Sequence, residues 1–430
     1  MTTTLANCRI ELSKQIRDYW AGTTTGAGSS TTLVDTALKA KSNDWVTDET
    51  FDLITEGTYI DEERKVSSLD NTSGTLTVLA HSNTPGSGID YEVHRMFTAS
   101  EKRIALVAAA RQAFPYIHKV IRDESKVAGN WLKDGSLEAW TTSTALTNWV
   151  TTTCTSTQTS SAGNFVHGSY SAALTSTAGS ISQTIAKNED LKYLAGKAVT
   201  FTVRGKTDTA SSLRIGIYDG TTTTYSSYVS NLNGWTAEIS PITVTATIGA
   251  NPSAVTFFIY HDSAAATDYV DDARVIGPDN PRIYIGDLSL PRNLPRQVFI
   301  EPENYYQGEH WGLIHGIKFD TVNGYMTLPR EYGTADLRLR ILGAGYLDFL
   351  ASGVSSTAWA ATIAIDSPQT DILVAQAILY LYTQMALPNF STNDRKSYQE
   401  MIGFWKGQLD NRIALFGMMP PPATINWSNR

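Results

Sequence analysis

Apolar residues recur at helical spacing near both ends of the chain. Residues 4–20 carry an apolar side chain every three or four positions with charges between them, which predicts an amphipathic helix. Ser100 is a candidate N-cap for a second helix that ends at Pro115. Residues 368–387 are strongly apolar and residues 392–416 again follow the helical period, so we expect these two segments to form an antiparallel helical hairpin.

Two regions between these helices alternate apolar and polar residues, as strands do. Residues 51–95 contain the runs FDLITEG and IDYEVHR, which predict a small antiparallel sheet or barrel, and the small-residue run AGTTTGAGSS before them predicts a loop. Residues 282–303 predict two short strands broken by prolines, and Asn323-Gly324 is a turn signal between the strands of a hairpin. The run LRLRILG behind the hairpin predicts a further strand.

The stretch from Gly135 to Gly277 differs from both of its flanks. It is rich in Thr and Ser and alternates in segments such as AVTFTV and LRIGIYDG, so it predicts a β-domain inserted into another unit. The expected fold class is α+β: a helical hairpin plus N-terminal helices with a small antiparallel β-unit, interrupted by an all-β insertion and followed by an extended C-terminal tail. The expected boundaries are 1–130 and 279–430 for the two parts of the carrier and 131–278 for the insertion.

Composition narrows the possible functions. The 430 residues have a formal net charge of -8 and no cluster of Lys and Arg, which disfavours binding to a phosphate backbone. No apolar run reaches the roughly 18 residues of a membrane span, and the N-terminus lacks the pattern of a signal peptide, so we expect no membrane contact and folding in a cytosol-like compartment. The seven histidines show no metal-binding spacing, and no P-loop or nucleophile elbow occurs, so we expect no enzymatic activity.

The insertion resembles the jelly-roll carbohydrate-binding modules that occur beside glycosidases. The segments that carry this resemblance include GSLEAWT, HGSYSAALTSTAGSISQTI, RIGIYDGT and the closing YVDDARV. In the resembling modules, carboxylates at the opening and in the closing strand hold a structural calcium ion, which implies Glu138, Asp271 and Asp272 here. Alternation in the closing strand turns Asp271 inward, where a carboxylate needs either a cation or several hydrogen bonds. A structural calcium ion, a hydrogen-bonded carboxylate and an exposed acid pair all remain open from the sequence, and we expect no other cofactor.

The same resemblance implies a sugar-binding surface made of exposed aromatic rings. The candidate residues are Tyr218, Tyr225, Tyr228 and Trp235, with Tyr225 and Tyr228 in or beside a hairpin. The alternative is that these side chains only cover the sandwich, because the sequence has Tyr and Thr where a row of Trp would be typical of a sugar binder.

The carrier resembles the head-to-tail adaptor, or neck connector, proteins of tailed bacteriophages. The resemblance lies in the order of sequence patterns along the chain and is carried by segments such as IGDLSLPRNLPRQVFIEP, FDTVNGYMTLP and DILVAQAILYLYTQM. It implies a homo-oligomeric ring of about twelve copies that contacts portal and tail or neck proteins, with DNA only as cargo passing through the channel. An acidic surface is compatible with such a channel, because it would repel the genome and let it slide.

The main functional hypothesis from the sequence is a virion structural protein. It would be a head-to-tail adaptor subunit in the neck of the particle, assembled in the host cytoplasm, with the jelly roll projecting outward. The alternative hypothesis is a glycan-binding decoration or attachment protein in which the insertion binds cell-surface sugar. A carbohydrate-active enzyme fragment would need an acid pair set in a cleft, which the sequence does not show.

Overall fold

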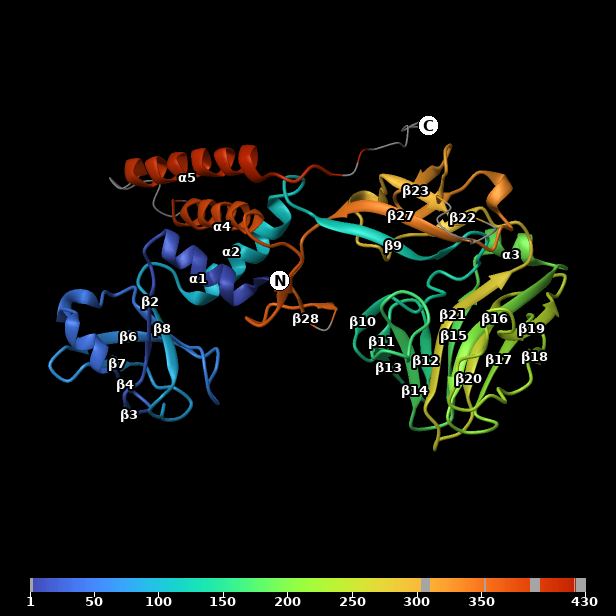
Figure 1. The fold of residues 1–430 in the computed structure, drawn as a ribbon, viewed down its shortest axis with the longest axis horizontal. Helices are drawn as coiled ribbons and strands as arrows, with labels where there is room; N and C mark the ends of the chain where they lie inside the picture. The colour runs from blue at the N-terminus through green and yellow to red at the C-terminus, as the bar shows by residue number, and fades with distance from the viewer. Residues whose placement is uncertain (1–2, 303–309, 352, 387–394, 421, 423–430) are drawn as a thin grey trace. The chain divides into compact units, whose positions relative to one another are not determined.

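The computed structural model describes residues 3–302, 310–351, 353–386, 395–420 and 422. The chain divides into two compact units, the first made of residues 1–119 and 346–419 and the second mainly of residues 120–345. Strands dominate the described residues, with seven sheets against five α-helices (Figure 1). No helix in this described part is long and apolar enough to cross a membrane.

The expected α+β class is therefore wrong, because the described chain is mainly β. Part of the error lies in the segment AGTTTGAGSS, which was expected to be a loop and instead contributes strands. Its small residues allow close strand pairing: a Cβ atom on Gly28 would lie 2.0 Å from the backbone oxygen of Thr32 on the neighbouring strand.

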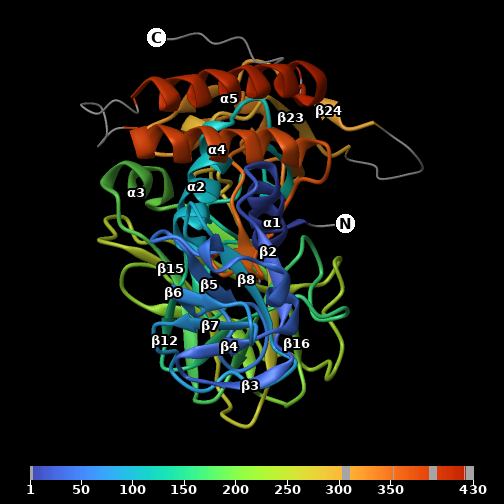
Figure 2. The ribbon, with the colours of Figure 1, turned by 90° about the vertical axis from the view of Figure 1, so that its left-hand side faces the viewer.

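The helices of the first unit lie in the segments that the hydrophobic period predicts, although the first ends at Gln15 instead of near residue 20. They are α1 (Leu5–Gln15), α2 (Ala99–Gln112), α4 (Gln369–Ala386) and α5 (Arg395–Phe416). The N-cap of α2 is Thr98 rather than Ser100, and it forms a reciprocal capping box with Glu101. The last two helices lie side by side (Figures 1 and 2), and α1, α2, α4 and α5 share one hydrophobic core. Most of the tail predicted to follow α5 falls outside the described residues.

Two antiparallel sheets complete the first unit and confirm the β-unit predicted there. The larger sheet has the strand order β2-β8-β5-β6-β7-β4-β3, and the smaller one has the order β1-β30-β28-β29. Their strands are β1 (Thr3–Thr4), β2 (Trp20–Thr23), β3 (Gly26–Ser29), β4 (Thr32–Val34), β5 (Phe51–Ile54), β6 (Glu63–Asp70), β7 (Thr75–Val78), β8 (Asp90–His94), β28 (Leu350–Ala351), β29 (Val354–Ser355) and β30 (Thr362–Ile363). Short 3-10 helices η1 (Thr36–Ala40) and η2 (Asn43–Trp45) connect β4 to β5.

The carrier strands of the second unit form two small antiparallel sheets with the orders β24-β23-β27-β9 and β22-β26-β25. The hairpin predicted at Asn323-Gly324 and the strand predicted at LRLRILG are both confirmed. The elements are β9 (Lys119–Val127), β22 (Arg282–Tyr284), η3 (Pro291–Asn293), β23 (Gln297–Ile300), β24 (Gly312–Leu313), β25 (Lys318–Asp320), β26 (Tyr325–Thr327), η4 (Arg330–Tyr332) and β27 (Arg338–Gly345).

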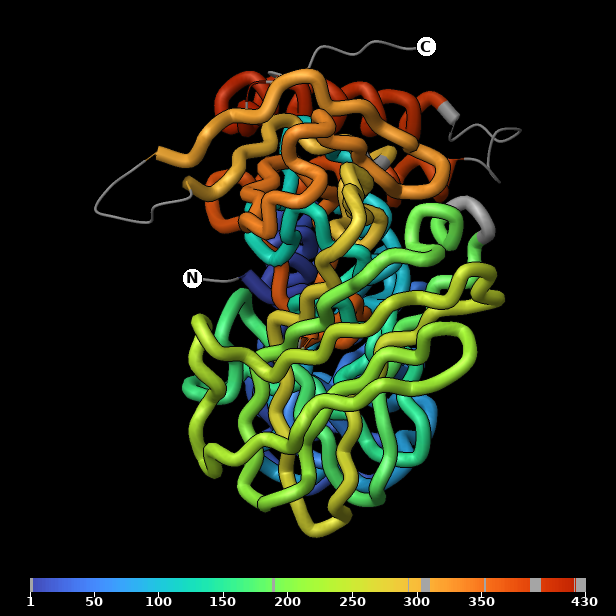
Figure 3. The backbone as a smooth tube through the Cα atoms, turned by 90° about the vertical axis from the view of Figure 1, so that its right-hand side faces the viewer, coloured from blue at the N-terminus to red at the C-terminus, as the bar shows by residue number. Residues whose placement is uncertain are grey.

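The inserted segment folds into two five-stranded antiparallel sheets, drawn in green to yellow in Figure 3. One sheet has the order β12-β15-β20-β17-β18 and the other the order β13-β14-β21-β16-β19, so the chain passes back and forth between the sheets as in a jelly roll. The strands are β12 (Val150–Thr152), β13 (Thr155–Thr159), β14 (Ser171–Thr175), β15 (Gly179–Ile185), β16 (Ala198–Thr207), β17 (Leu213–Tyr218), β18 (Thr223–Tyr225), β19 (Ile242–Thr247), β20 (Val255–His261) and β21 (Asp268–Ile276). A small ribbon of β10 (Trp140–Thr142) and β11 (Ala145–Leu146) and the helix α3 (Asn188–Leu194) complete the insertion.

The core of the jelly roll follows directly from the alternation seen in the sequence. Every second residue of β16 is buried, and Phe201 from this strand meets Phe257 of β20 edge to face at 5.6 Å between ring centroids. Since Ile215, Ile217 and Ile259 are fully buried in the same core, the residues between them must lie on the outer face of their sheet.

Candidate functional site

That outer face carries a group of aromatic side chains around one arginine. We call Arg214, Tyr225, Tyr228, Phe258 and Tyr260 the aromatic patch. The strand register explains how it forms: Tyr260 lies opposite Arg214, and Phe258 lies opposite Gly216, which in turn lies opposite Tyr225. Strands β20, β17 and β18 therefore bring together residues that are more than thirty positions apart in the sequence.

The rings of the patch contact one another and remain open to solvent. Phe258 and Tyr260 are stacked, with centroids 5.3 Å apart and an interplanar angle of 22°, and Tyr225 lies 5.5 Å from Tyr260. Tyr225 is 46% exposed and Tyr228 is 38% exposed. Scattered exposed rings are ordinary, but these contacting rings on the outer face of a sheet present their apolar area in one place, which makes the patch a candidate binding surface.

Arg214 links the rings through its guanidinium group. Its central carbon lies 4.4 Å from the ring centroid of Tyr225, 4.9 Å from that of Tyr228 and 5.5 Å from that of Tyr260. Asp262 neutralises its charge in an ion pair of 2.7 Å and also accepts a hydrogen bond of 2.9 Å from the hydroxyl group of Tyr228. The patch is thus apolar in its rings, polar at its edge and close to neutral overall.

Two neighbouring features shape the patch. A Cβ atom on Gly216 would lie 3.1 Å from the ring of Tyr260 and 3.3 Å from that of Tyr225, so glycine at this position leaves room for both rings. Tyr228 also lines a neighbouring groove of about 410 Å³, together with Ser, Thr and Asn residues such as Ser230 and Asn231 and apolar residues such as Val229 and Ile242. Hydroxyl and amide groups therefore lie next to the aromatic surface.

The structure brings together only part of the predicted aromatic set. Tyr225 and Tyr228 lie in the patch, and Tyr218 lies on the same face of β17, opposite Thr256. Trp235 lies elsewhere: its indole nitrogen donates to the backbone oxygen of Gly163 at 2.9 Å, and the residue after it bonds to β16 of the other sheet.

Three patch residues were missed from the sequence, namely Arg214, Phe258 and Tyr260. The run VTFFIYH contained the signal for two of them, because burial of Phe257 and Ile259 requires Phe258 and Tyr260 to point outward. Their contact with Tyr225 depends on strand pairing and could not be deduced from one segment.

Two of the predicted calcium ligands, Glu138 and Asp271, both bind one loop of the insertion, residues 163–170. Asp271 is fully buried, as the alternation predicts, and accepts hydrogen bonds from the backbone N–H groups of Val166, His167 and Asp272. Glu138 accepts hydrogen bonds from the N–H groups of Ser169 and Tyr170 through one oxygen. Both carboxylates thus hold the loop in place through its backbone.

Asp272 has a different partner. It lies at a bulge in the pairing of β16 with β21 and forms an ion pair of 2.8 Å with Arg274, while His167 of the loop lies 3.6 Å from the same carboxylate oxygen. Among the described residues, no group of three or more His, Cys, Asp or Glu side chains is placed to hold a metal ion. In this structure backbone hydrogen bonds satisfy Asp271 and one oxygen of Glu138, and a calcium ion bound by these carboxylates stays a prediction.

Burial perturbs these carboxyl groups strongly. Loss of hydration raises the pKa of Glu138 to about 8 and that of Asp271 to about 7. Each rise is partly opposed by the backbone N–H groups that bond the ionised form. The two groups therefore hold protons up to near-neutral pH, which limits the negative charge collected beneath the loop.

Comparison with known proteins gives a likeness of fold only. No family model matches the chain, and no curated protein sequence matches it. A carbohydrate-binding module of family 61 in complex with β-1,4-galactotriose is 12% identical with a TM-score of 0.26, over 34% of this chain and 97% of that one. A xylan-binding family 22 module of Paenibacillus barcinonensis Xyn10C is 11% identical with a TM-score of 0.24, over 37% and 96%.

A third solved structure is the enzymatically active domain of tailspike protein 4 from bacteriophage CBA120, which is 15% identical with a TM-score of 0.27, over 35% of this chain and 21% of that one. None of these three structures is a head-to-tail adaptor. The strand pairing by itself defines a jelly-roll β-sandwich. At such low TM-scores the likeness carries no argument about a ligand.

Proposed function

We propose that this chain is a glycan-binding protein and that the aromatic patch on the jelly roll is its binding surface. The observation that supports the proposal is the contact of Tyr225, Phe258 and Tyr260 on the outer face of one sheet, with nearly half of Tyr225 exposed to solvent. Aromatic faces pack against the C–H groups of a pyranose ring while its hydroxyl groups seek polar partners.

The patch provides both kinds of contact. The rings offer the apolar surface, and Arg214, Asp262 and the hydroxyl group of Tyr228 lie beside them as donors and acceptors. Serine, threonine and asparagine side chains in the neighbouring groove extend the polar surface, which suits a sugar chain of several residues. Because Asp262 neutralises Arg214, the patch favours an uncharged glycan over a polyanion.

Glycan-array binding by the full-length chain, followed by calorimetry on the best ligand, tests the proposal. Tyr225→Ala and Tyr260→Ala should each weaken binding about tenfold, since each removes one ring from the surface. The matched control is Tyr193→Ala, because Tyr193 is 65% exposed on helix α3 of the insertion, away from the patch. An array without any ligand, or equal losses in all three variants, would contradict the proposal.

The role expected for the carrier remains a prediction. The resemblance to neck connectors implies ring assembly with portal and tail proteins in a virion, and no geometry described above depends on it. Sedimentation of the purified chain with and without portal protein tests it, and a chain that stays monomeric at high concentration with portal present would count against it. The expectation that the chain has no enzymatic activity likewise remains a prediction.

A further inference from the structure

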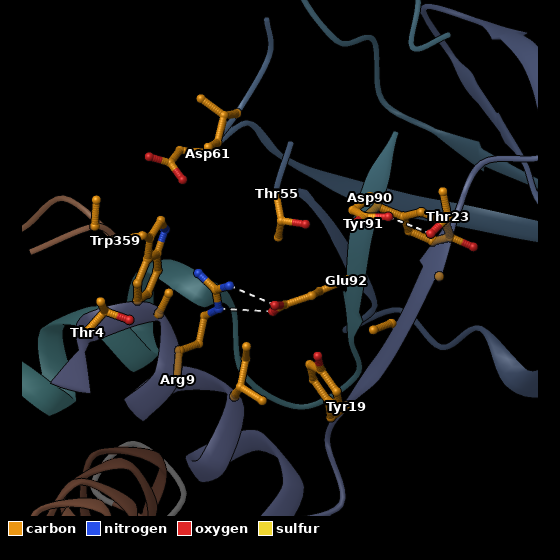
Figure 4. Close-up of a pocket in the computed structure, with 16 residues that line it drawn as sticks. Thr4, Arg9, Tyr19, Thr23, Thr55, Asp61, Asp90, Tyr91, Glu92 and Trp359 are labelled. Carbon is orange, nitrogen blue, oxygen red and sulfur yellow. Dashed lines mark hydrogen bonds and ion pairs between the residues drawn. The ribbon is translucent and has the colours of Figure 1, made fainter. Parts of the chain in front are cut away.

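The first unit contains a cavity of about 540 Å³ that the glycan proposal does not involve. It lies between helix α1, the sheet face formed by β2 and β8, the segment 55–61 that follows β5, and the segment around Trp359 (Figure 4). Figure 4 shows the Arg9 guanidinium, the Glu92 carboxylate and the hydroxyl group of Tyr19 directed toward the same space. The chemistry of these groups restricts what the cavity can bind.

The floor of the cavity is already neutralised. Arg9 donates two hydrogen bonds to Glu92, at 2.9 and 2.7 Å, and both side chains are at least nine-tenths buried. With its charge compensated in this way, Arg9 is a poor partner for an incoming anion.

The ring of Trp359 is already in contact with two arginine side chains. The guanidinium carbon of Arg9 lies 4.2 Å from its ring centroid and that of Arg103 lies 5.2 Å away, and the residue is only 5% exposed. A sugar ring would therefore have no free aromatic face on Trp359. The cavity differs in this respect from the aromatic patch of the jelly roll.

The rim is acidic and partly apolar. Asp61 and Asp90 are exposed carboxylates, and neither forms an ion pair with any described residue. Asp90 accepts a hydrogen bond from the hydroxyl group of Thr23. In Figure 4, Asp61 lies on the side of Trp359, and Asp90 with Thr23 lies on the opposite side. The 56% exposed side chain of Ile60 adds hydrocarbon to the same rim.

We propose that this cavity binds an organic cation, an ammonium or guanidinium group on an aliphatic stem. Two uncompensated carboxylates on opposite sides attract positive charge, the paired floor does not repel it, and Ile60 and Tyr19 offer contact to the stem. Lysine and arginine side chains of a partner and free polyamines share this chemistry.

Calorimetric titration of the full chain at low ionic strength tests the proposal. The probes are spermidine, capped arginine amide and capped lysine amide, with glucose and inorganic phosphate as chemically distinct comparisons. At least one cationic probe should bind, and binding should weaken with added salt. Tighter binding of spermidine would indicate a free polyamine, and tighter binding of a capped amino acid would indicate a basic side chain.

The double variant Asp61→Asn, Asp90→Asn should lower the affinity about tenfold, the amount expected from two partly exposed ion pairs. The matched control is Asp44→Asn, Asp48→Asn, which removes the same charge from exposed positions of the same unit outside the cavity. All four residues are exposed, so unchanged thermal unfolding is expected in both variants. No binding of any cationic probe, equal losses in the two double variants, or preferential binding of glucose or phosphate would overturn the proposal.

Discussion

Replacing Glu138 with Gln should remove much of the pH dependence of the stability of the second unit. One oxygen of Glu138 accepts hydrogen bonds from Ser169 and Tyr170, and Gln offers an oxygen acceptor in the same place. Burial raises the pKa of the carboxyl group from 4.5 to about 8. Because of that difference, the free energy of unfolding should fall by up to about 5 kcal/mol between a pH below both pKa values and a pH above them.

The sign follows from proton binding. A carboxyl group whose pKa is higher in the folded state keeps its proton there while the unfolded chain has lost it. Its contribution to stability is complete below about pH 4.5, falls as the pH rises toward 8, and is lost above that value. Gln cannot ionise, so Glu138→Gln should be about as stable as the wild type near pH 5 and clearly more stable near pH 8.5.

Thermal unfolding of the full chain at the two pH values measures the effect, and amide hydrogen exchange of residues 163–170 locates it. The control Glu331→Gln changes an exposed carboxylate of the same unit and should follow the wild type. The same pH dependence in the wild type and in Glu138→Gln would refute the reasoning. A large stabilisation of the wild type by calcium near pH 8 would show that the carboxylates hold a cation instead.

Two further substitutions test the packing of the units. Lys126→Met should destabilise the second unit by about 3 kcal/mol or more in chemical denaturation, because Asp287 would stay buried without the Lys126 amine that lies 2.7 Å from it. A loss of stability below about 1 kcal/mol would contradict this. Gly22→Ala should destabilise the first unit by about 1–3 kcal/mol, because the new Cβ atom would lie 2.4 Å from a carboxylate oxygen of Asp35. Gly86→Ala, whose Cβ atom meets nothing within 4 Å, should leave stability almost unchanged, and equal losses in the two glycine variants would refute the argument.

Local patterns in the sequence predicted individual helices and hairpins better than they predicted the fold class. Helical periodicity located α1, α2, α4 and α5, and the Asn323-Gly324 turn located a hairpin, because each signal lies within one segment. The class was misjudged because strands as short as β3 carry too few residues for alternation to show. Pairing with β4, and not the sequence of β3 itself, makes this segment a strand.

In the candidate site, too, features that lie within one segment were predicted, and features that depend on pairing between segments were not. The inward position of Asp271 followed from alternation, whereas its three N–H donors come from the loop and from a bulge that no single segment encodes. Tyr225 was found as an aromatic residue beside a hairpin, but its contact with Tyr260 depends on the order β20-β17-β18 in the sheet. Trp235 was chosen by residue type, and sheet order places it outside the patch.

The most direct test of the glycan proposal is to map where an array-selected oligosaccharide contacts the full chain. Transferred magnetisation from the aromatic protons of the protein to the bound sugar, compared between the wild type and Tyr225→Ala, reports that contact. We expect magnetisation transfer from Tyr225, Phe258 and Tyr260 to the sugar in the wild type, and we expect this transfer to be lost or strongly reduced in the variant. Contacts confined to other aromatic residues, unchanged in Tyr225→Ala, would contradict the assignment of the aromatic patch as the binding surface.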